Sequence, residues 1–336
     1  MKLLVEEARP MYEAAAAFKK LECWNWLSNS HIFGIQNPES DEIGYCCVMG
    51  NGGEMYGIAI YLGTEGLDVL LKLLRGELQG NPLFVQHCLL MSFGGRDELY
   101  PEEYKQIKDL GLSFRGRTAW PTFRLYEPGY VPWPVMTEEH LRYFSLCLEQ
   151  AAALALEVQD DPDYLFEGQG ERFLVRIPEL AADQQHVWTS RWVVPKPLVE
   201  KNAELAPINE IRCAHIRKMP QPDNLVWEAG LYYLPAPVME GERPYYPQLF
   251  IIGEQTTGMI IHSGLKQKDR ILQHCADDLL SLLEKMNTRP AKLLFADEEM
   301  ARTWLHLLGT LEIEVYVAER LPLLEEAVED IINYFG

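Results

Sequence analysis

The chain contains two stretches in which strand-like runs and glycines follow one another in the same order. YCCVMGNGGEMYGIAIYLG (45–63) and QLFIIGEQTTGMIIHSGL (248–265) each consist of an apolar run, a glycine, a short turn, a glycine and a second run ending at a further glycine. A helical pattern, a strand, a second helix, and a closing strand and helix follow in both cases. This spacing predicts that the two ends of the chain are folded copies of each other, produced by a duplication.

With 31–35 as the first strand of one copy and 225–234 as the first strand of the other, each copy has the order βββαβαβα. This is the order of ribonuclease H-like and actin-like folds, in which a mixed five-stranded sheet carries helices on both faces. We therefore predict an α+β or α/β protein with domains over 1–158 and 225–336, joined by a β-rich connecting region over 159–224. Two domains also agree with the length, because a single core usually stops growing at roughly 250 to 300 residues.

Proline pairs follow three of the four strands predicted in and after the connecting region. Proline lacks the backbone donor of a strand ladder, so each pair should end its strand. The alternative is that these pairs form a proline-rich ligand for SH3-type modules. Isolated P-x-P units that follow strands do not favour this alternative. The predicted strands are 172–177, 186–194, 209–219 and 225–234, and the pairs are Pro195-Lys-Pro197, Pro220-Gln-Pro222 and Pro235-Ala-Pro237.

The glycine corner of the first repeat could turn a hairpin or wrap a phosphate. Phosphate-binding corners of actin-like kinases have an acidic residue just before them, but Met49 and Ile252 occupy that place here, and no lysine follows either turn. Asn51-Gly52 is instead a standard pair for a type I′ hairpin, which needs positive φ at both positions. We predict a plain hairpin.

The charge balance argues against nucleic acid and anionic membranes as partners. Thirty Lys and Arg residues against fifty Asp and Glu residues give a formal charge of −20, which repels phosphate at long range. The best local basic patch is Arg115-Gly-Arg117 with Trp120 and Arg124, which we interpret as a solvated loop or strand edge in preference to an anion site.

The seven cysteines have no regular spacing, and adjacent Cys46 and Cys47 would point to opposite faces of one strand. Such cysteines suit reduced, buried thiols better than a disulfide framework. The first residues, MKLLVEEARP, are too polar for a signal peptide, and no apolar run approaches the length of a membrane span. We expect a soluble cytoplasmic protein.

Three carboxylates of the C-terminal copy suggest a metal-dependent enzyme. Ribonuclease H-like enzymes hold two divalent cations with acids from the first strand, the first helix and the end of the fourth strand. Glu228, Asp277 (with Asp278) and Asp297 have those positions, and Mg²⁺ or Mn²⁺ would be the cofactor. The N-terminal copy has no matching acids, and among fifty acids such spacing arises easily by chance. The solvated-surface interpretation is therefore favoured.

Other catalytic and metal patterns are weak. His262, His274 and Cys275 match no zinc spacing, and no C-x-x-C, H-E-x-x-H or G-x-S-x-G occurs. Structural roles are favoured for these residues.

Large aromatic residues in the loops and middle strands suit a protein or ligand interface, because they bury much area at little entropic cost. Packing between domains explains them equally well. The interface candidates are Trp120, Tyr130, Trp133, Tyr245 and Tyr246.

YEAAAAFKKLECWNWL and GYCCVMGNGGEMYGIAIYLG in the first half, with RPAKLLFADEEMARTWLHLLGTLEIEVYVAERLPLLEEA near the end, resemble bacterial proteins known only as domains of unknown function. Some of these resemble proteins with a Cys-rich zinc-binding tail of the SEC-C type, which this sequence lacks. The resemblance implies no catalytic residues. We therefore expect a non-catalytic binding or adaptor protein, with an unknown protein or small-molecule partner. The alternative is a divalent-metal-dependent hydrolase or phosphoryl-transfer enzyme.

Overall fold

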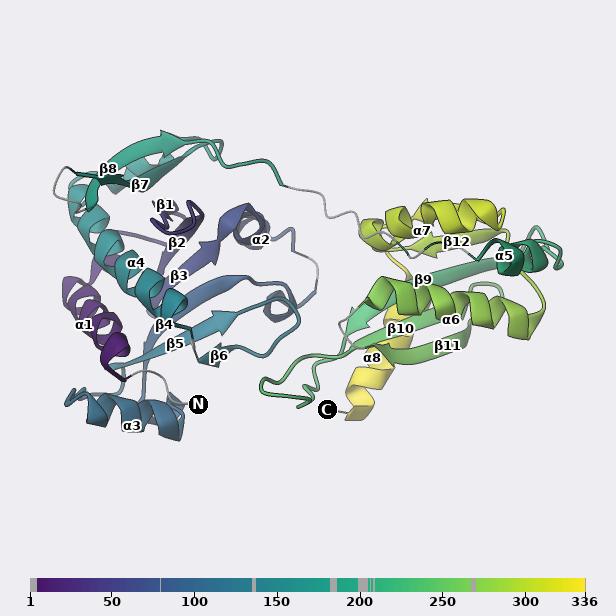
Figure 1. Cartoon of the computed structure of the whole chain (residues 1–336), viewed down its shortest axis with the longest axis horizontal. Helices are drawn as coiled ribbons and strands as arrows, with labels where there is room; N and C mark the ends of the chain where they lie inside the picture. The colour runs from purple at the N-terminus through teal and green to yellow at the C-terminus, as the bar shows by residue number, and fades with distance from the viewer. Residues whose placement is uncertain are drawn as a thin grey trace. The chain divides into compact units, whose positions relative to one another are not determined.

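The chain folds into two compact units, Met1–Leu198 and Val199–Gly336 (Figure 1). Each unit contains one mixed β-sheet with helices packed on it, which confirms the predicted α+β class. No helix in the described part of the chain is long and apolar enough to cross a membrane. The computed structural model describes residues 5–78, 80–134, 137–181, 186–198, 205, 207, 209–266 and 270–335.

The N-terminal unit alternates helices and strands, with 3₁₀ turns between several of them. Its elements are α1 (Val5–Leu21), η1 (Cys23–Asn25), β1 (Phe33–Gln36), β2 (Ile43–Met49), β3 (Tyr56–Leu62), α2 (Gly63–Arg75), η2 (Pro82–Phe84), β4 (Cys88–Gly94), η3 (Arg96–Glu98), α3 (Pro101–Asp109), β5 (Trp120–Tyr126), β6 (Trp133–Pro134), α4 (Glu138–Glu157), η4 (Pro162–Phe166), β7 (Phe173–Leu180) and β8 (His186–Val193).

The strands of this unit form one sheet in the order β6-β5-β4-β3-β2-β1-β7-β8. Strands β1 to β6 form an antiparallel meander, in which each strand pairs with the next along the chain. Strand β7 then pairs in parallel with β1, and β8 pairs antiparallel with β7. The long connection that contains α4 makes the parallel pair possible, because parallel neighbours need a crossover.

The N-terminal unit therefore does not have the predicted ribonuclease H-like strand pairing, although its elements follow the predicted order. In the ribonuclease H-like arrangement the fourth strand would pair in parallel with the first, but β4 pairs antiparallel with β3. The free edge of β1 is occupied by β7, where Gly34 pairs with Val175. A Cβ atom at Gly34 would lie 2.8 Å from a methyl group of Val175, so the missing side chain permits this approach.

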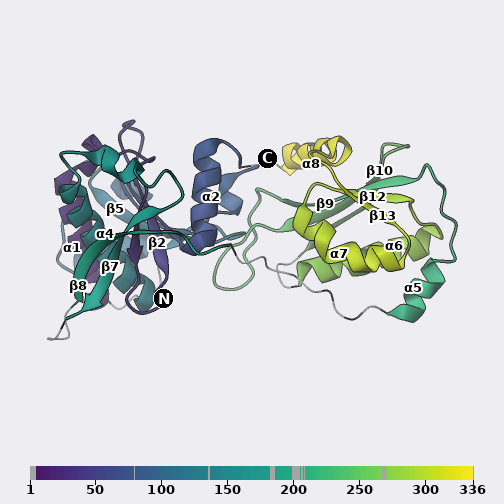
Figure 2. The same cartoon turned by 90° about the horizontal axis from the view of Figure 1, so that it is seen from above.

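The two faces of the first sheet are buried beneath different helices. Ile58 and Ile60 of β3 belong to a core cluster with residues of α1 and α4, which pack against each other. Ala59 and Tyr61 point the other way, into a cluster that includes residues of α2. Figures 1 and 2 show α2 on the opposite side of this sheet from α1 and α4. Cys46 and Cys47 on β2 divide between the same two clusters, as the sequence predicts, and all seven cysteines are free and buried.

The glycine corner joins β2 to β3 in an antiparallel hairpin, as predicted, but not through a type I′ turn. The Gly53 N–H donates to the Gly50 carbonyl at 2.9 Å, which encloses Asn51 and Gly52. Positive φ occurs at Gly50 and Gly53, whereas a type I′ turn would require it at the two enclosed residues. The loop is also longer than two residues, because β3 begins only at Tyr56.

The C-terminal unit has a five-stranded sheet in the order β11-β10-β9-β12-β13. The three strands β9 to β11 are antiparallel neighbours, β12 pairs in parallel with β9, and β13 pairs in parallel with β12. Its elements are α5 (Glu210–Ile216), β9 (Val226–Tyr233), β10 (Gln248–Glu254), β11 (Met259–Lys266), α6 (Ile271–Met286), β12 (Lys292–Phe295), α7 (Glu298–Thr310), β13 (Glu314–Val317) and α8 (Pro322–Phe335).

Helices cover both faces of this second sheet. Trp227, Ala229 and Phe295 pack with α6 and α7 on one face. Leu249 and Ile251 pack with α8 on the other face, and Figure 2 shows α8 across the sheet from α6 and α7. The alternation along β9 and β10 therefore assigns each side chain to one of the two helical layers.

The predicted connecting region does not form a layer of its own. Strands β7 and β8 extend the first sheet, and the predicted strand at 209–219 is wrong because α5 occupies it. Asn209 caps this helix by accepting from the Arg212 N–H at 3.1 Å. Cys213 and Ile216, three positions apart, are buried in the core of the second unit. The cap and the helical spacing thus override the strand-like composition.

Local sequence signals mark several helix ends. Thr137 accepts from the His140 N–H at 3.1 Å and begins α4. Gly111 has a φ of 69° just after α3, and Pro322 is the first residue of α8. These positions depend on local backbone geometry, which a short stretch of sequence specifies.

Replacement of Gly57 by alanine is expected to destabilise the N-terminal unit by about 2 kcal/mol or more. A Cβ atom there would overlap the Met91 carbonyl oxygen and lie 3.0 Å from the Ser92 Cα, so the backbones of β3 and β4 would have to separate. Gly52→Ala is the control, because nothing lies within 4 Å of its added Cβ. Equal unfolding midpoints in urea for the two variants would contradict this pairing of β3 with β4.

Candidate functional site

The three predicted carboxylates of the C-terminal unit are not brought together. Trp227 and Ala229 face α6 and α7, so Glu228 between them points to the opposite face. Its partner in the ladder is Gly253, whose added Cβ would meet Leu323 of α8, which places that pair on the α8 side. Asp277 belongs to α6, on the other side of the sheet.

Each carboxylate instead has a local structural contact. Glu228 is 2 % exposed, and one of its oxygens accepts from Gln255 at 3.0 Å. Asp277 accepts from Gln273 one turn earlier at 3.2 Å. Asp297 caps α7 by accepting from the N–H groups of Glu299 at 2.8 Å and Met300 at 3.3 Å. Across the described residues, no group of three His, Cys, Asp or Glu side chains can hold a metal ion.

The predicted His and Cys candidates also separate. His262 on β11 lies 3.0 Å from a carboxylate oxygen of Asp278 on α6, outside the angular range of a hydrogen bond. Lys266 pairs with the same oxygen. Cys275 is fully buried, and burial raises the pKa of its thiol to about 12, whereas His274 is exposed. This arrangement is a partly buried ion cluster with a neutral thiol behind it.

His262 should titrate below its ordinary pKa of 6.5. Burial lowers the pKa most, Asp278 raises it, and Lys266 and Lys285 lower it. A depressed histidine pKa means that protonation opposes folding, so the stability is present above the ordinary pKa and is lost as the pH falls through the folded pKa. Asp278→Asn should move the midpoint of the His262 NMR titration to still lower pH. Asp277→Asn is the matched control, and an unchanged or higher midpoint in Asp278→Asn would refute the assignment.

The predicted interface aromatics pack largely within their own units. The Trp120 ring lies 5.8 Å from the rings of Tyr104 and Phe114, and Trp133 lies 5.9 Å from Tyr100. In the C-terminal unit Tyr246 is buried, and Tyr245 donates to Glu240 at 2.8 Å. Tyr130 is half-buried. Packing within one unit therefore involves Trp120, Trp133 and Tyr246.

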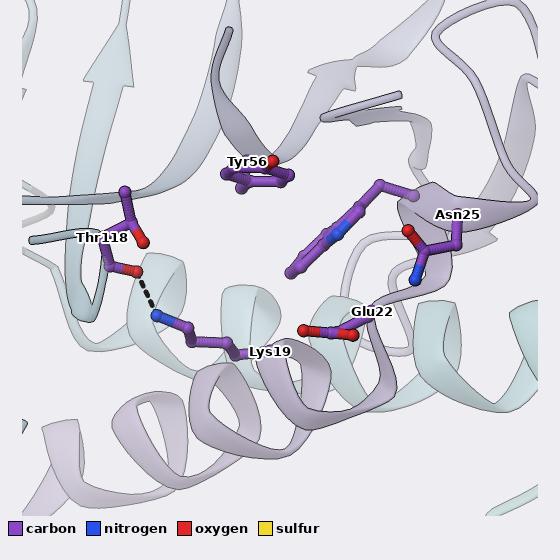
Figure 3. Close-up of a pocket in the computed structure, with 6 residues that line it drawn as sticks. Lys19, Glu22, Asn25, Tyr56 and Thr118 are labelled. Atoms are coloured by element: carbon purple, nitrogen blue, oxygen red, sulfur yellow. Dashed lines mark hydrogen bonds between the residues drawn. The ribbon is translucent and has the colours of Figure 1, made fainter. Parts of the chain in front are cut away.

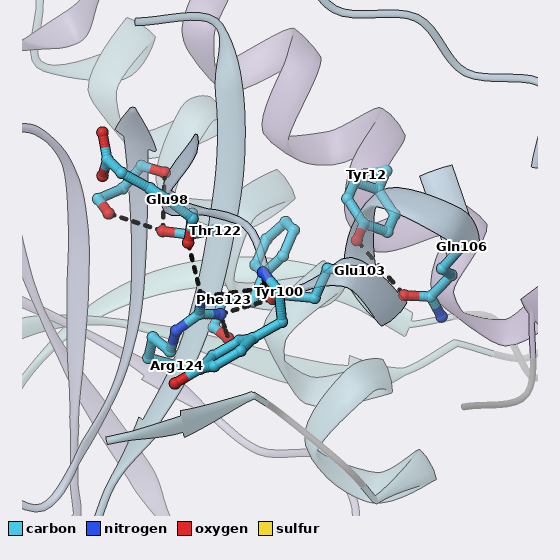
Figure 4. A network of polar contacts seen from close by, with 9 residues as sticks. Tyr12, Glu98, Tyr100, Glu103, Gln106, Thr122, Phe123 and Arg124 are labelled. Atoms are coloured by element: carbon cyan, nitrogen blue, oxygen red, sulfur yellow. Dashed lines mark hydrogen bonds and ion pairs between the residues drawn. The ribbon is translucent and has the colours of Figure 1, made fainter. Parts of the chain in front are cut away.

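The Arg124 side chain is largely covered, contrary to its interpretation as part of a solvated loop or strand edge. Two of its guanidinium nitrogens donate to the two carboxylate oxygens of Glu103 at 2.5 and 3.0 Å. Only 12 % of the Arg124 side chain and 6 % of the Glu103 side chain are exposed. Figure 4 shows this pair where β5 meets α3. The arginine is committed to an internal carboxylate and offers no anion site.

Two further polar pairs lie near Arg124 and Glu103, although the buried amide nitrogen of Gln106 makes no hydrogen bond. The Tyr12 hydroxyl donates to Gln106 at 3.4 Å, and burial raises the pKa of that phenol. The hydroxyls of Ser92 and Thr122 lie 2.9 Å apart on neighbouring strands (Figure 4). These contacts fix α1, α3 and the β4–β5 pair to one another.

Glu103→Gln should lower the free energy of unfolding by about 3 kcal/mol, because it leaves the Arg124 charge buried without its partner. Glu102→Gln, at the exposed neighbouring position, should leave stability within about 0.5 kcal/mol of the wild type. Urea unfolding followed by far-UV circular dichroism measures both variants. A loss in Glu103→Gln no larger than in the control would show that the pair is dispensable.

A cavity of about 280 Å³ opens between the end of α1, the start of β3 and the loop before β5 (Figure 3). It is the clearest candidate site in the described structure, because charged, polar and aromatic groups converge on it. The lining residues are Lys19, Glu22, Trp24, Asn25, Tyr56 and Thr118.

The chain builds this cavity with an abrupt turn after α1. Glu22 has a φ of 51°, an uncommon conformation for a residue with a side chain, and leads into η1. Trp24 is then only 6 % exposed, and its ring lies 5.1 Å from that of Tyr56. A Cβ at Gly50 would lie 2.7 Å from the Tyr56 ring and 3.0 Å from Trp24. The glycine corner therefore shapes the cavity wall.

Lys19 is the cation of the cavity. Its ammonium donates to the Thr118 carbonyl and lies 5.0 Å from the centre of the Phe93 ring. Burial lowers the pKa of Lys19, and the nearby Glu22 carboxylate raises it. The ammonium is thus held at one end of the cavity by a neutral acceptor.

Three other lining groups are available to a ligand. Within the described part of the chain, the Glu22 carboxylate, the Asn25 amide and the Tyr56 hydroxyl make no side-chain hydrogen bond or ion pair. Sequence reasoning missed this site, since its residues come from three separate segments. The only signal was Trp24 directly after an amphipathic helix, which equally indicates a core residue.

These features define a two-unit α+β protein with a small polar and aromatic cavity in its N-terminal unit. Residues 9–176 match the family described as Domain of unknown function (DUF7309), and residues 212–332 match Domain of unknown function (DUF6930). The first match spans half of the chain, which therefore belongs to the DUF7309 family. The resemblance to domains of unknown function is confirmed. No curated protein matches the sequence.

Proposed function

We propose that the protein is a non-catalytic binding or adaptor protein, and that the cavity at the end of α1 is where it binds a small molecule. The observation that carries this proposal is the convergence of unpaired polar groups on an aromatic wall, which is typical of ligand sites. Among the six lining residues, no serine, cysteine or histidine could act as a nucleophile or shuttle a proton at neutral pH. The cavity suits recognition better than chemistry.

The alternative function, a divalent-metal-dependent hydrolase or phosphoryl-transfer enzyme, has no structural observation in its favour. Its three carboxylates would have to converge within a few ångströms to clamp two cations. Glu228 lies on the α8 face of the sheet, whereas Asp277 lies on α6 and Asp297 caps α7. We therefore rank it below the binding function.

We further propose that the C-terminal unit is ribonuclease H-like and lacks that fold's metal chemistry. The order β11-β10-β9-β12-β13, with three antiparallel strands followed by two parallel ones, supports this assignment. A cytoplasmic location is part of the proposal and is supported by seven free, buried thiols. The charge of −20 favours a small molecule or protein over nucleic acid as the partner.

Asn25→Trp should abolish ligand binding by filling the cavity. Asn25 is exposed at the rim, so the fold should tolerate the larger side chain. A fragment library screened against the wild type by ligand-observed NMR should give binders, and the variant should lose them. Unchanged thermal unfolding of the variant would show that it remains folded.

The matched control is Asn29→Trp, which adds the same ring at an exposed position outside the lining. It should retain the fragments that bind the wild type. The proposed function is refuted if no fragment binds the wild type, or if Asn25→Trp binds the same fragments with the same affinity.

A further inference from the structure

We infer that the cavity recognises an alkylammonium zwitterion, a small molecule with a positively charged ammonium group at one end and a carboxylate at the other. This inference rests on the proposed binding function and deepens it by naming the ligand class. The two ends of the cavity carry opposite charges, and Figure 3 shows Lys19 beside Thr118 and Glu22 on the side of Asn25.

The Glu22 end is suited to the cation. Its carboxylate feels the charge of Lys19 but makes no hydrogen bond or ion pair within the described residues, so a bound ammonium could pair with it directly. The neighbouring wall consists of the Trp24 and Tyr56 rings, whose centres are 5.1 Å apart. Aromatic faces attract alkylammonium groups through the negative charge of their π systems, and they do so without needing N–H donors.

The Lys19 end is suited to the anion. A lysine ammonium has three donors, and the structure uses one of them on the Thr118 carbonyl. That contact orients the ammonium without neutralising it, because the acceptor is a neutral amide. A ligand carboxylate can therefore accept the remaining donors and form a charge-assisted hydrogen bond.

The volume of the cavity and the net charge of the protein narrow the class of ligand further. A volume of about 280 Å³ is at the small end of ligand pockets, so it suits a single small metabolite better than a length of polymer. The protein carries a formal charge of −20, which opposes the approach of a purely anionic ligand. A zwitterion has no net charge and satisfies both charged ends at once.

Three probes of almost equal shape test the inference by isothermal titration calorimetry on the wild-type chain. Glycine betaine carries both charges, choline carries the ammonium without the carboxylate, and the carbon isostere of betaine has a tert-butyl group in place of the trimethylammonium. The charge-assisted hydrogen bond to Lys19 should contribute about tenfold in affinity, whereas the trimethylammonium, which has no N–H donor, should gain about threefold from its cation–π contacts and from the Glu22 charge. Betaine should therefore bind about tenfold more tightly than choline and about threefold more tightly than its carbon isostere.

Variants assign the two ends. Lys19→Met should weaken betaine and its carbon isostere about tenfold and leave choline unchanged, whereas Glu22→Gln should weaken betaine and choline and leave the isostere unchanged. The controls Lys20→Met and Glu13→Gln, at exposed positions on the same helix, should leave all three affinities unchanged.

The inference is overturned if betaine binds no more tightly than both analogues, a comparison that needs no variant. It is also overturned if Lys19→Met and Glu22→Gln fold but leave betaine affinity unchanged. If no probe binds while Asn25→Trp still removes the fragments bound by the wild type, the ligand class fails and the binding function stands. If no probe binds and Asn25→Trp also keeps the fragments bound by the wild type, the binding function is refuted as well.

Discussion

The pairing of β1 with β7 determines the architecture of the N-terminal unit. Once β7 occupies the free edge of β1, the fourth strand cannot join there and the sheet grows from β3 outward through β4 and β5. Gly34 permits the close contact with Val175 on which that pair depends. The same growth places β5, and the loop before it, beside α1. The cavity lies where these segments meet. Its position therefore depends on the pairing of β7 with the edge of β1.

Charged side chains are paired at Arg124 and Glu103 but not around the cavity of the N-terminal unit. Arg124 and Glu103 pair through two hydrogen bonds, and such a pair is costly to break and leaves no free charge for a ligand. Around the cavity, Glu22 remains unpaired at the surface and Lys19 is held by a neutral carbonyl. The first arrangement stabilises the packing of α3 on the sheet, and the second keeps opposite charges available at two ends of a cavity.

Sequence reasoning placed most helices and strands and misjudged how they associate. The division of Cys46 and Cys47 between the two faces of β2 follows from local backbone geometry. The carboxylate prediction had the correct elements but ignored pleat parity, because Glu228 alternates with the core residues Trp227 and Ala229. Whether a strand residue points toward a given helix becomes known only when it is clear which face of the sheet that helix covers.

The sequence by itself determined features that depend on a few neighbouring residues or on composition: the glycine-rich hairpin, the free thiols and the formal charge of −20. Tertiary structure decided which strand edges pair, that Arg124 pairs with Glu103, and that Lys19, Tyr56 and Thr118 line one cavity. The physical reason is that local conformation is set by short-range sterics and hydrogen bonds. Whether a polar group finds a partner or remains open to a ligand depends on segments far apart in the chain.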